Sequence, residues 1–137
     1  MKRKICCIVY TILNSEIKFL VLHKNNWWNG WELVRGDLTN NEDYNYGIIR
    51  EVNLVTGLNI DNINNFHFNY SYDYLKELNR VNANVSCFVA KSDDLMVTLD
   101  KEHDYYKWIS FNSAMKLIDF DEQKKMLELF YNKFRTI

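Results

Sequence analysis

WELVRGDLTNNEDYNYGIIREVNLVTGL, residues 31–58, is the stretch that decides the fold. A short apolar segment with strand character, Trp31 to Val34, runs into Gly36 and then into a polar, Asn-rich loop. A segment long enough for a helix follows, Glu42 to Thr56, and Gly57 ends it, because glycine readily takes the left-handed conformation of a helix C-terminus. A strand, a glycine loop and a helix in this order present backbone amides and helix side chains to an anion.

The spacing of single residues in this stretch is more specific than the order of its elements. It resembles the Nudix box, G-x5-E-x7-R-E-U-x-E-E-x-G-U, where U is an apolar residue. The positions in register are Gly36, Glu42, Arg50, Glu51, Val52, Gly57 and Leu58. The two central glutamates of the box are missing, and Leu54 and Val55 stand in their places.

A helix advances about 100° per residue, so positions 51, 54 and 55 share one face. Three carboxylates on that face, beside a loop of free amides, would make the oxygen site that Mg²⁺ prefers. Such a metal would bridge polyphosphate oxygens and activate a water. Because Glu51 alone supplies an anion here, we expect weak affinity for Mg²⁺ or Mn²⁺.

The C-terminal part of the chain carries a second resemblance. Residues 102–128 are similar to the same part of the asymmetrical diadenosine tetraphosphate hydrolases, with matches at Glu102, His103, Tyr106, Trp108 and Phe120. Near the box, Trp31 and the pair Arg35-Gly36 match the W-x-x-P-K-G motif of that subfamily, with Arg for Lys and Val34 for Pro. The 5′-triphosphate RNA pyrophosphohydrolases share this ancestry, so the substrate class stays open. A Lys and a Tyr of the subfamily are replaced by Ala83 and Cys87, which weakens the expected grip on phosphate and base.

The resemblance implies roles for particular residues. The candidate catalytic residues, which would also be the metal ligands, are Glu51 and Glu102. The candidate substrate-binding residues are Lys24, Arg35, Gly36 and Tyr106. The residues expected to support the box structurally are Glu42, Arg50 and Gly57. Without the resemblance, Glu102 is equally a solvated loop carboxylate and Tyr106 a packed ring.

The remaining elements follow from hydrophobic periodicity. Strands are predicted at Lys4–Ile12, Ile17–His23, Asn62–Tyr74, Arg80–Ala90, Met96–Leu99 and Tyr106–Ile109. Helices are predicted from Ser110 to Leu117 and from Asp119 or Asp121 to Phe134. In the long strand the aromatic residues share one face: Phe66, Phe68, Tyr70, Tyr72 and Tyr74. The predicted fold is α+β, an α/β/α sandwich with a mixed central sheet, the Nudix helix and C-terminal helices.

Composition limits the class of protein. The 137 residues predict a single domain over 1–137, and a net charge of −1 argues against a broadly basic nucleic-acid-binding coat. The three cysteines lie in apolar runs without metal-ligand spacing, so we expect buried, reduced thiols at Cys6, Cys7 and Cys87. No stretch approaches the roughly 18 apolar residues of a membrane helix, and the apolar run after the basic start is too short for a signal peptide. We therefore expect a cytoplasmic protein.

Trp27 and Trp28 lie in a loop, where they either pack against the protein or stack on a base of the ligand.

Two classes of function remain. The first is a Nudix-fold protein that binds nucleoside polyphosphates, either a dinucleoside polyphosphate or a triphosphorylated RNA 5′ end, with absent or weak hydrolysis. The second is an active Mg²⁺-dependent diadenosine tetraphosphate hydrolase or RNA 5′-pyrophosphohydrolase that works with Glu51 and Glu102. Leu54 and Val55 favour the first, because any metal would have to be held largely by the ligand.

Overall fold

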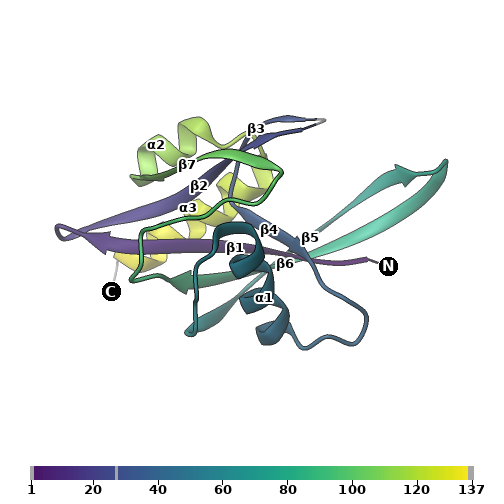
Figure 1. The fold of residues 1–137 in the computed structure, drawn as a ribbon, viewed down its shortest axis with the longest axis horizontal. Coiled ribbons are helices and arrows are strands. Elements are labelled where there is room, and N and C mark those ends of the chain that lie inside the picture. Colours follow the sequence, from purple (N-terminus) through teal and green to yellow (C-terminus); the bar gives the residue numbers. More distant parts are fainter. Residues whose placement is uncertain (1, 27, 136–137) are drawn as a thin grey trace.

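The computed structural model describes residues 2–26 and 28–135 (Figure 1). The strands are β1 (Lys2–Leu13), β2 (Glu16–Asn25), β3 (Asn29–Glu32), β4 (Val34–Asp37), β5 (Ile63–Lys76), β6 (Asn79–Lys91) and β7 (His103–Ile109). The helices are α1 (Tyr44–Thr56), α2 (Phe111–Leu117) and α3 (Asp121–Arg135). Within the described residues the strands form one mixed sheet in the order β3-β2-β1-β6-β5, while β4 pairs with β1 and β7 pairs with β2. β1 runs parallel to β6, and the other pairs are antiparallel.

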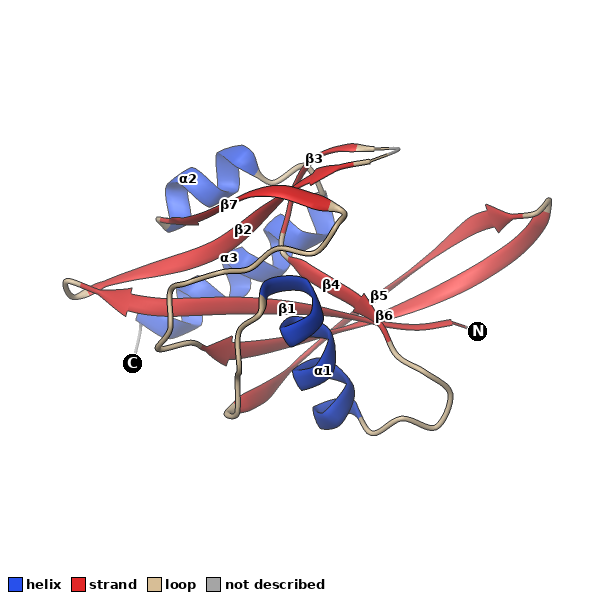
Figure 2. Ribbon diagram, viewed as in Figure 1, coloured by secondary structure: helices blue, strands red, loops and turns tan. Residues whose placement is uncertain are grey.

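The helices lie on both faces of the sheet, as the sandwich prediction requires (Figure 2). Side chains alternate along β1, so Ile5 and Cys7 pack towards α1 while Cys6 and Ile8 pack towards α2 and α3. A strand buried on both faces reads as a continuous apolar run, and this explains why residues 5–9 carry no polar alternation.

The three cysteines are free and buried, as the sequence predicts. Burial raises the pKa of the Cys7 and Cys87 thiols to about 12, so both stay protonated at neutral pH. Of the helices in the described part of the chain, none is long and apolar enough to cross a membrane.

Helix α1 begins at Tyr44, two residues later than predicted. The Asp43 side chain caps the helix by accepting a hydrogen bond from the Tyr46 amide, at 3.3 Å. Glu42 therefore lies in the loop rather than on the helix. At the other end Gly57 has a φ of 73°, which is the conformation expected of a glycine that ends a helix.

The strand predicted at Met96–Leu99 is wrong. This segment is extended, but its backbone bonds to the end of α1 instead of to the sheet: the Thr98 amide donates to the Thr56 carbonyl at 2.8 Å, and the Asp100 amide to the Val55 carbonyl at 3.2 Å. The predicted strand at Tyr106–Ile109 is longer and starts at His103.

The strand predicted at Trp31–Val34 is divided between β3 and β4. The Leu33 amide donates to the buried side-chain oxygen of Gln123 on α3, at 2.7 Å, and so leaves the sheet pairing.

Candidate functional site

The end of β4 packs directly against α1. A Cβ atom at Gly36 would lie 2.6 Å from Glu51 Cγ, so only glycine lets the strand approach the helix this closely. The strand and the helix therefore present Gly36 and Glu51 side by side.

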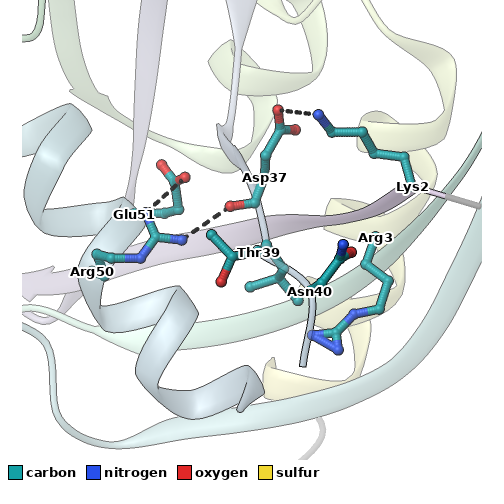
Figure 3. Close-up of a pocket in the computed structure, with 8 residues that line it drawn as sticks. Lys2, Arg3, Asp37, Thr39, Asn40, Arg50 and Glu51 are labelled. Atoms are coloured by element: carbon teal, nitrogen blue, oxygen red, sulfur yellow. Dashed lines mark hydrogen bonds and ion pairs between the residues drawn. The ribbon is translucent and has the colours of Figure 1, made fainter. Parts of the chain in front are cut away.

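Arg50 ties this loop to the helix. Its guanidinium donates to both carboxylate oxygens of Glu42 at 2.8 Å. It also donates to the Asp37 carbonyl at 3.1 Å (Figure 3). Glu42 in turn accepts the Thr39 amide at 2.9 Å. These hydrogen bonds, first the one from Arg50, lower the pKa of Glu42 to about 2. The groove drawn in Figure 3 has a volume of about 520 Å³, and Lys2, Arg3 and Arg50 contribute its cations.

A larger cavity of about 1090 Å³ shares Asp37 and Glu51 with this groove. It brings together most of the site residues that the sequence suggested: Lys24, Arg35, Gly36, Glu51 and Glu102. Tyr106 is not among the residues that line it. Tyr106 stands opposite Leu22 in the β2–β7 pair and is 38% exposed.

A buried network fixes Arg35 at this cavity. Its Nε donates to Glu32 at 2.8 Å, and Glu32 is only 2% exposed. His103 lies between two carboxylates, with Nε2 2.8 Å from Glu32 and Nδ1 2.7 Å from Asp100. Arg35 Cζ also lies 5.0 Å from the ring centre of Phe120. The other guanidinium nitrogens of Arg35 can then serve a ligand, because Glu32 engages the guanidinium through Nε.

The network holds its charges through mutual pairing. Burial acts to raise the pKa of Glu32, but the His103 hydrogen bond and the Arg35 charge outweigh it and lower that pKa. Burial acts to lower the pKa of His103, but the hydrogen bonds to Glu32 and Asp100 outweigh it and raise that pKa. Both partners are therefore stabilised in their charged forms.

The face of α1 that follows Glu51 is not acidic. Leu54 and Val55 both line the cavity, but Leu54 is 60% exposed, whereas Val55 is 7% exposed and also packs in the hydrophobic core. Burial raises the pKa of Glu51, and the nearby Arg50, 3.2 Å from one carboxylate oxygen, opposes that rise. Glu51 is thus a partly buried carboxylate whose partner is already an arginine.

Glu102 enters the cavity from the loop before β7. One of its carboxylate oxygens accepts a hydrogen bond from the Asn26 side chain at 3.0 Å. Its carbonyl accepts the Asn25 amide at 2.9 Å. The backbone of Glu102 is therefore anchored to the end of β2.

Two groups of aromatic side chains also line the cavity. Trp28 packs against Phe120 with ring centres 4.9 Å apart; Trp27 lies outside the described residues. On the other side of Arg35 stands a row from β5: Tyr70, Tyr72 and Tyr74. The alternation along residues 62–74 predicted the shared face of these tyrosines but not that the face borders the cavity.

Glu32 also lines the cavity, and neither sequence motif indicated it. A single carboxylate inside the apolar WELV segment was the available signal, since a buried charge needs a partner.

Comparisons with known proteins agree with this geometry. A family model described as the NUDIX domain matches residues 2–130. Several solved structures share the fold at low sequence identity. A C. elegans Ap4A hydrolase in a binary complex superposes with a TM-score of 0.77 at 20% identity, covering 100% of both chains. A NUDIX hydrolase from Listeria monocytogenes has a TM-score of 0.79 at 21% identity, over 97% of this chain and 94% of that one. The NUDIX domain of Shewanella oneidensis NrtR, complexed with ADP ribose, has a TM-score of 0.77 at 11% identity, over 96% and 87% of the two chains.

NUDIX domains normally use divalent metal ions. The donor set of this chain fits such an ion poorly. Position 55 is an apolar core residue, position 54 is a leucine, and the carboxylate of Glu51 is paired with Arg50. Among the residues that the structure describes, no group of three His, Cys, Asp or Glu side chains is placed to hold a metal.

The burial of Val55 predicts unequal costs for restoring the two missing carboxylates. Leu54→Glu places its charge in solvent and should change the free energy of unfolding by less than about 0.5 kcal/mol. Val55→Glu places a charge in the core and should destabilise the fold by about 3 kcal/mol. Urea denaturation of both variants beside wild type measures the difference. Equal stabilities of the two variants would contradict the burial of Val55.

The buried network predicts a pH dependence of stability. The folded pKa of His103 lies above its ordinary value of 6.5, so its contribution is complete below pH 6.5 and is lost as the pH rises through the folded pKa. The folded pKa of Glu32 lies below 4.5, so its contribution is present above pH 4.5 and is lost as the pH falls. Wild type should therefore lose stability as the pH rises above 6.5, and His103→Gln should lose less over the same rise. An equal loss in both proteins, measured by urea denaturation, would remove His103 from this role.

Proposed function

Because the chain belongs to the Nudix family, we propose that it binds nucleoside polyphosphates, either a dinucleoside polyphosphate or a triphosphorylated RNA 5′ end, with absent or weak hydrolysis. The observation that carries the proposal is the α1 face beside Gly36. It has one carboxylate, Glu51, where a metal site needs several, and Val55 is built into the core. The chain has the Nudix fold but fewer carboxylate ligands for a catalytic metal ion than the Nudix box provides.

The other walls of the cavity support a polyphosphate ligand. Arg35 is held in place by a buried carboxylate, and an arginine fixed in this way loses little freedom on binding an anion. Lys4 and Lys24 line the same cavity, and aromatic rings on either side of Arg35 offer surfaces for a base. The folds shared with an Ap4A hydrolase and with an ADP-ribose complex support a nucleotide as the ligand.

Seven carboxylates in the described part of the chain line the cavity, and Lys or Arg side chains pair with Glu32, Asp37 and Glu51 among them. Glu32 pairs with Arg35 and His103, Asp37 with Lys2 and Lys4, and Glu51 with Arg50. An incoming polyphosphate therefore meets paired carboxylates rather than exposed negative charge at these three positions. We expect the ligand to bring its own divalent counter-ion, since no three His, Cys, Asp or Glu side chains of the described residues are grouped to hold one.

The alternative is an active hydrolase, and one observation favours it. Glu51 belongs to the Nudix box and Glu102 to the C-terminal stretch that begins at residue 102, and both line the same cavity. Together with phosphate oxygens of a ligand they could hold Mg²⁺, which often binds through one or two carboxylates and substrate phosphates.

Binding is tested by titrating diadenosine tetraphosphate and a 5′-triphosphorylated RNA into wild type and Arg35→Ala. Loss of a charge-assisted phosphate contact should weaken binding by about tenfold or more. Arg135→Ala is the matched control, because Arg135 lies at the C-terminal end of α3, where it contacts Tyr131. Equal affinities of wild type and Arg35→Ala would remove Arg35 from the site, and no binding of either ligand would end the proposal.

Hydrolysis is tested on the same ligands with Mg²⁺ and with Mn²⁺. We expect wild type to turn over slowly or not at all, and Glu51→Gln to leave that rate nearly unchanged. Rapid turnover that both Glu51→Gln and Glu102→Gln abolish would establish the alternative instead.

A further inference from the structure

The β5–β6 hairpin projects from the body of the protein (Figure 1), and β5 carries a row of aromatic side chains along its length. The distances between successive ring centres are 6.4 Å from Phe68 to Tyr70, 6.5 Å from Tyr70 to Tyr72 and 6.0 Å from Tyr72 to Tyr74. Before this row, Phe66 packs against Phe130 of α3, 6.0 Å between ring centres.

The residue type changes from phenylalanine to tyrosine where the cavity begins. Tyr70, Tyr72 and Tyr74 line the cavity, and Phe66 and Phe68 do not. Within the described part of the chain none of the three tyrosine hydroxyl groups makes a hydrogen bond to protein, and none is a buried atom lacking a partner. Three phenols that only covered a sheet would need no hydroxyl group, whereas a polar ligand in the cavity can use it.

The tyrosines form one wall of a strip whose other wall is cationic. In the sheet Lys4 aligns with Val85, and Val85 with Tyr70; Lys2 aligns with Ala83, and Ala83 with Tyr72. Val85 and Ala83 are buried and form a floor of small side chains between the two walls.

The second wall of the strip, formed by Lys2 and Lys4, carries a net positive charge. Lys2 and Lys4 both pair with Asp37, at 3.4 and 2.9 Å, so two cations face one carboxylate. Lys4 Nζ also lies 5.7 Å from the ring centre of Tyr74, which places an ammonium group beside the last ring of the row. The strip thus combines an aromatic wall with a net positive wall, and Arg35 lies at its inner end.

We propose that this strip binds a single-stranded oligonucleotide, with the bases on Tyr70, Tyr72 and Tyr74 and the sugar–phosphate backbone along Lys4 and Lys2. Aromatic rings paired with cations are what sequence-tolerant single-strand binding uses. The spacing of about 6 Å between rings is nearly twice the roughly 3.4 Å per nucleotide of a stacked strand. Only an extended, unstacked strand can place successive bases on successive rings, so a duplex is excluded.

The inference rests on the proposed function and narrows it. If Arg35 holds a 5′ polyphosphate, the nucleotides that follow lead outward along the hairpin, which favours an RNA 5′ end over a dinucleoside polyphosphate. Different measurements test the two proposals. The proposed function is tested by the effect of Arg35 on the binding of a single nucleotide. The strip is tested by how affinity depends on the number of nucleotides in the RNA.

The experiment measures the affinity of 5′-triphosphorylated RNAs of one, two, three and five nucleotides, in the presence of Mg²⁺. Affinity should rise about tenfold or more between one and three nucleotides, and a 5′-triphosphorylated hairpin duplex should show no such gain. Tyr74→Ala and Tyr72→Ala should each reduce this gain in affinity between one and three nucleotides. Tyr74→Phe keeps the ring and should retain most of the gain in affinity. Retention in this variant would show that the loss in Tyr74→Ala comes from loss of stacking rather than from misfolding.

Tyr46→Ala is the matched control, since Tyr46 is an exposed tyrosine on α1, outside the strip. Affinity that does not change with length, or that changes equally in wild type and in folded Tyr72→Ala and Tyr74→Ala, would overturn the inference even if Arg35 binds the single nucleotide. If wild type and Arg35→Ala fail equally to bind the single nucleotide, but both gain affinity as the RNA lengthens, the strip is supported and the proposed polyphosphate site is overturned.

Discussion

The ion pair between Arg50 and Glu42 is the interaction on which the site depends. Two hydrogen bonds of 2.8 Å join them, and a third from Arg50 reaches the Asp37 carbonyl. Through these contacts one side chain of α1 holds both ends of the loop that connects β4 to α1. Gly36 can then lie against Glu51, where any side chain would collide. The frame of a Nudix site is maintained in this way without help from the residues at positions 54 and 55.

On that frame the cavity is lined by cations and aromatic rings, and the α1 face carries one carboxylate, Glu51, in place of a cluster. The Glu32–His103–Asp100 network fixes Arg35 from behind, and the tyrosines of β5 extend the cavity along the hairpin. Val55 belongs to the hydrophobic core, so the apolar residue there now contributes to stability. This division of roles is consistent with a protein that recognises a phosphorylated nucleic-acid end and does little chemistry on it.

The sequence alone predicts those parts of the fold that depend on residues close together in the chain. The loop at Gly36, helix α1 and its end at Gly57 follow from local spacing and capping, and the pairing of β5 with β6 follows from alternation. The failures involve contacts between distant segments. Met96–Leu99 reads as a strand, but its amides bond to the end of α1. Glu32 meets His103 across 71 positions in the chain, and the tyrosines of β5 border the cavity, and no local spacing indicates either feature.

A crystal structure with Mn²⁺ and a non-hydrolysable dinucleoside polyphosphate tests most directly whether the site binds without a protein-held metal. The anomalous signal of manganese locates the ion independently of the ligand. We predict phosphate oxygens on Arg35, a base against the tyrosines of β5, and any ordered manganese on the phosphates of the ligand. An ordered manganese ion on the Glu51 carboxylate, with Arg50 displaced from it, would contradict this and restore the hydrolase.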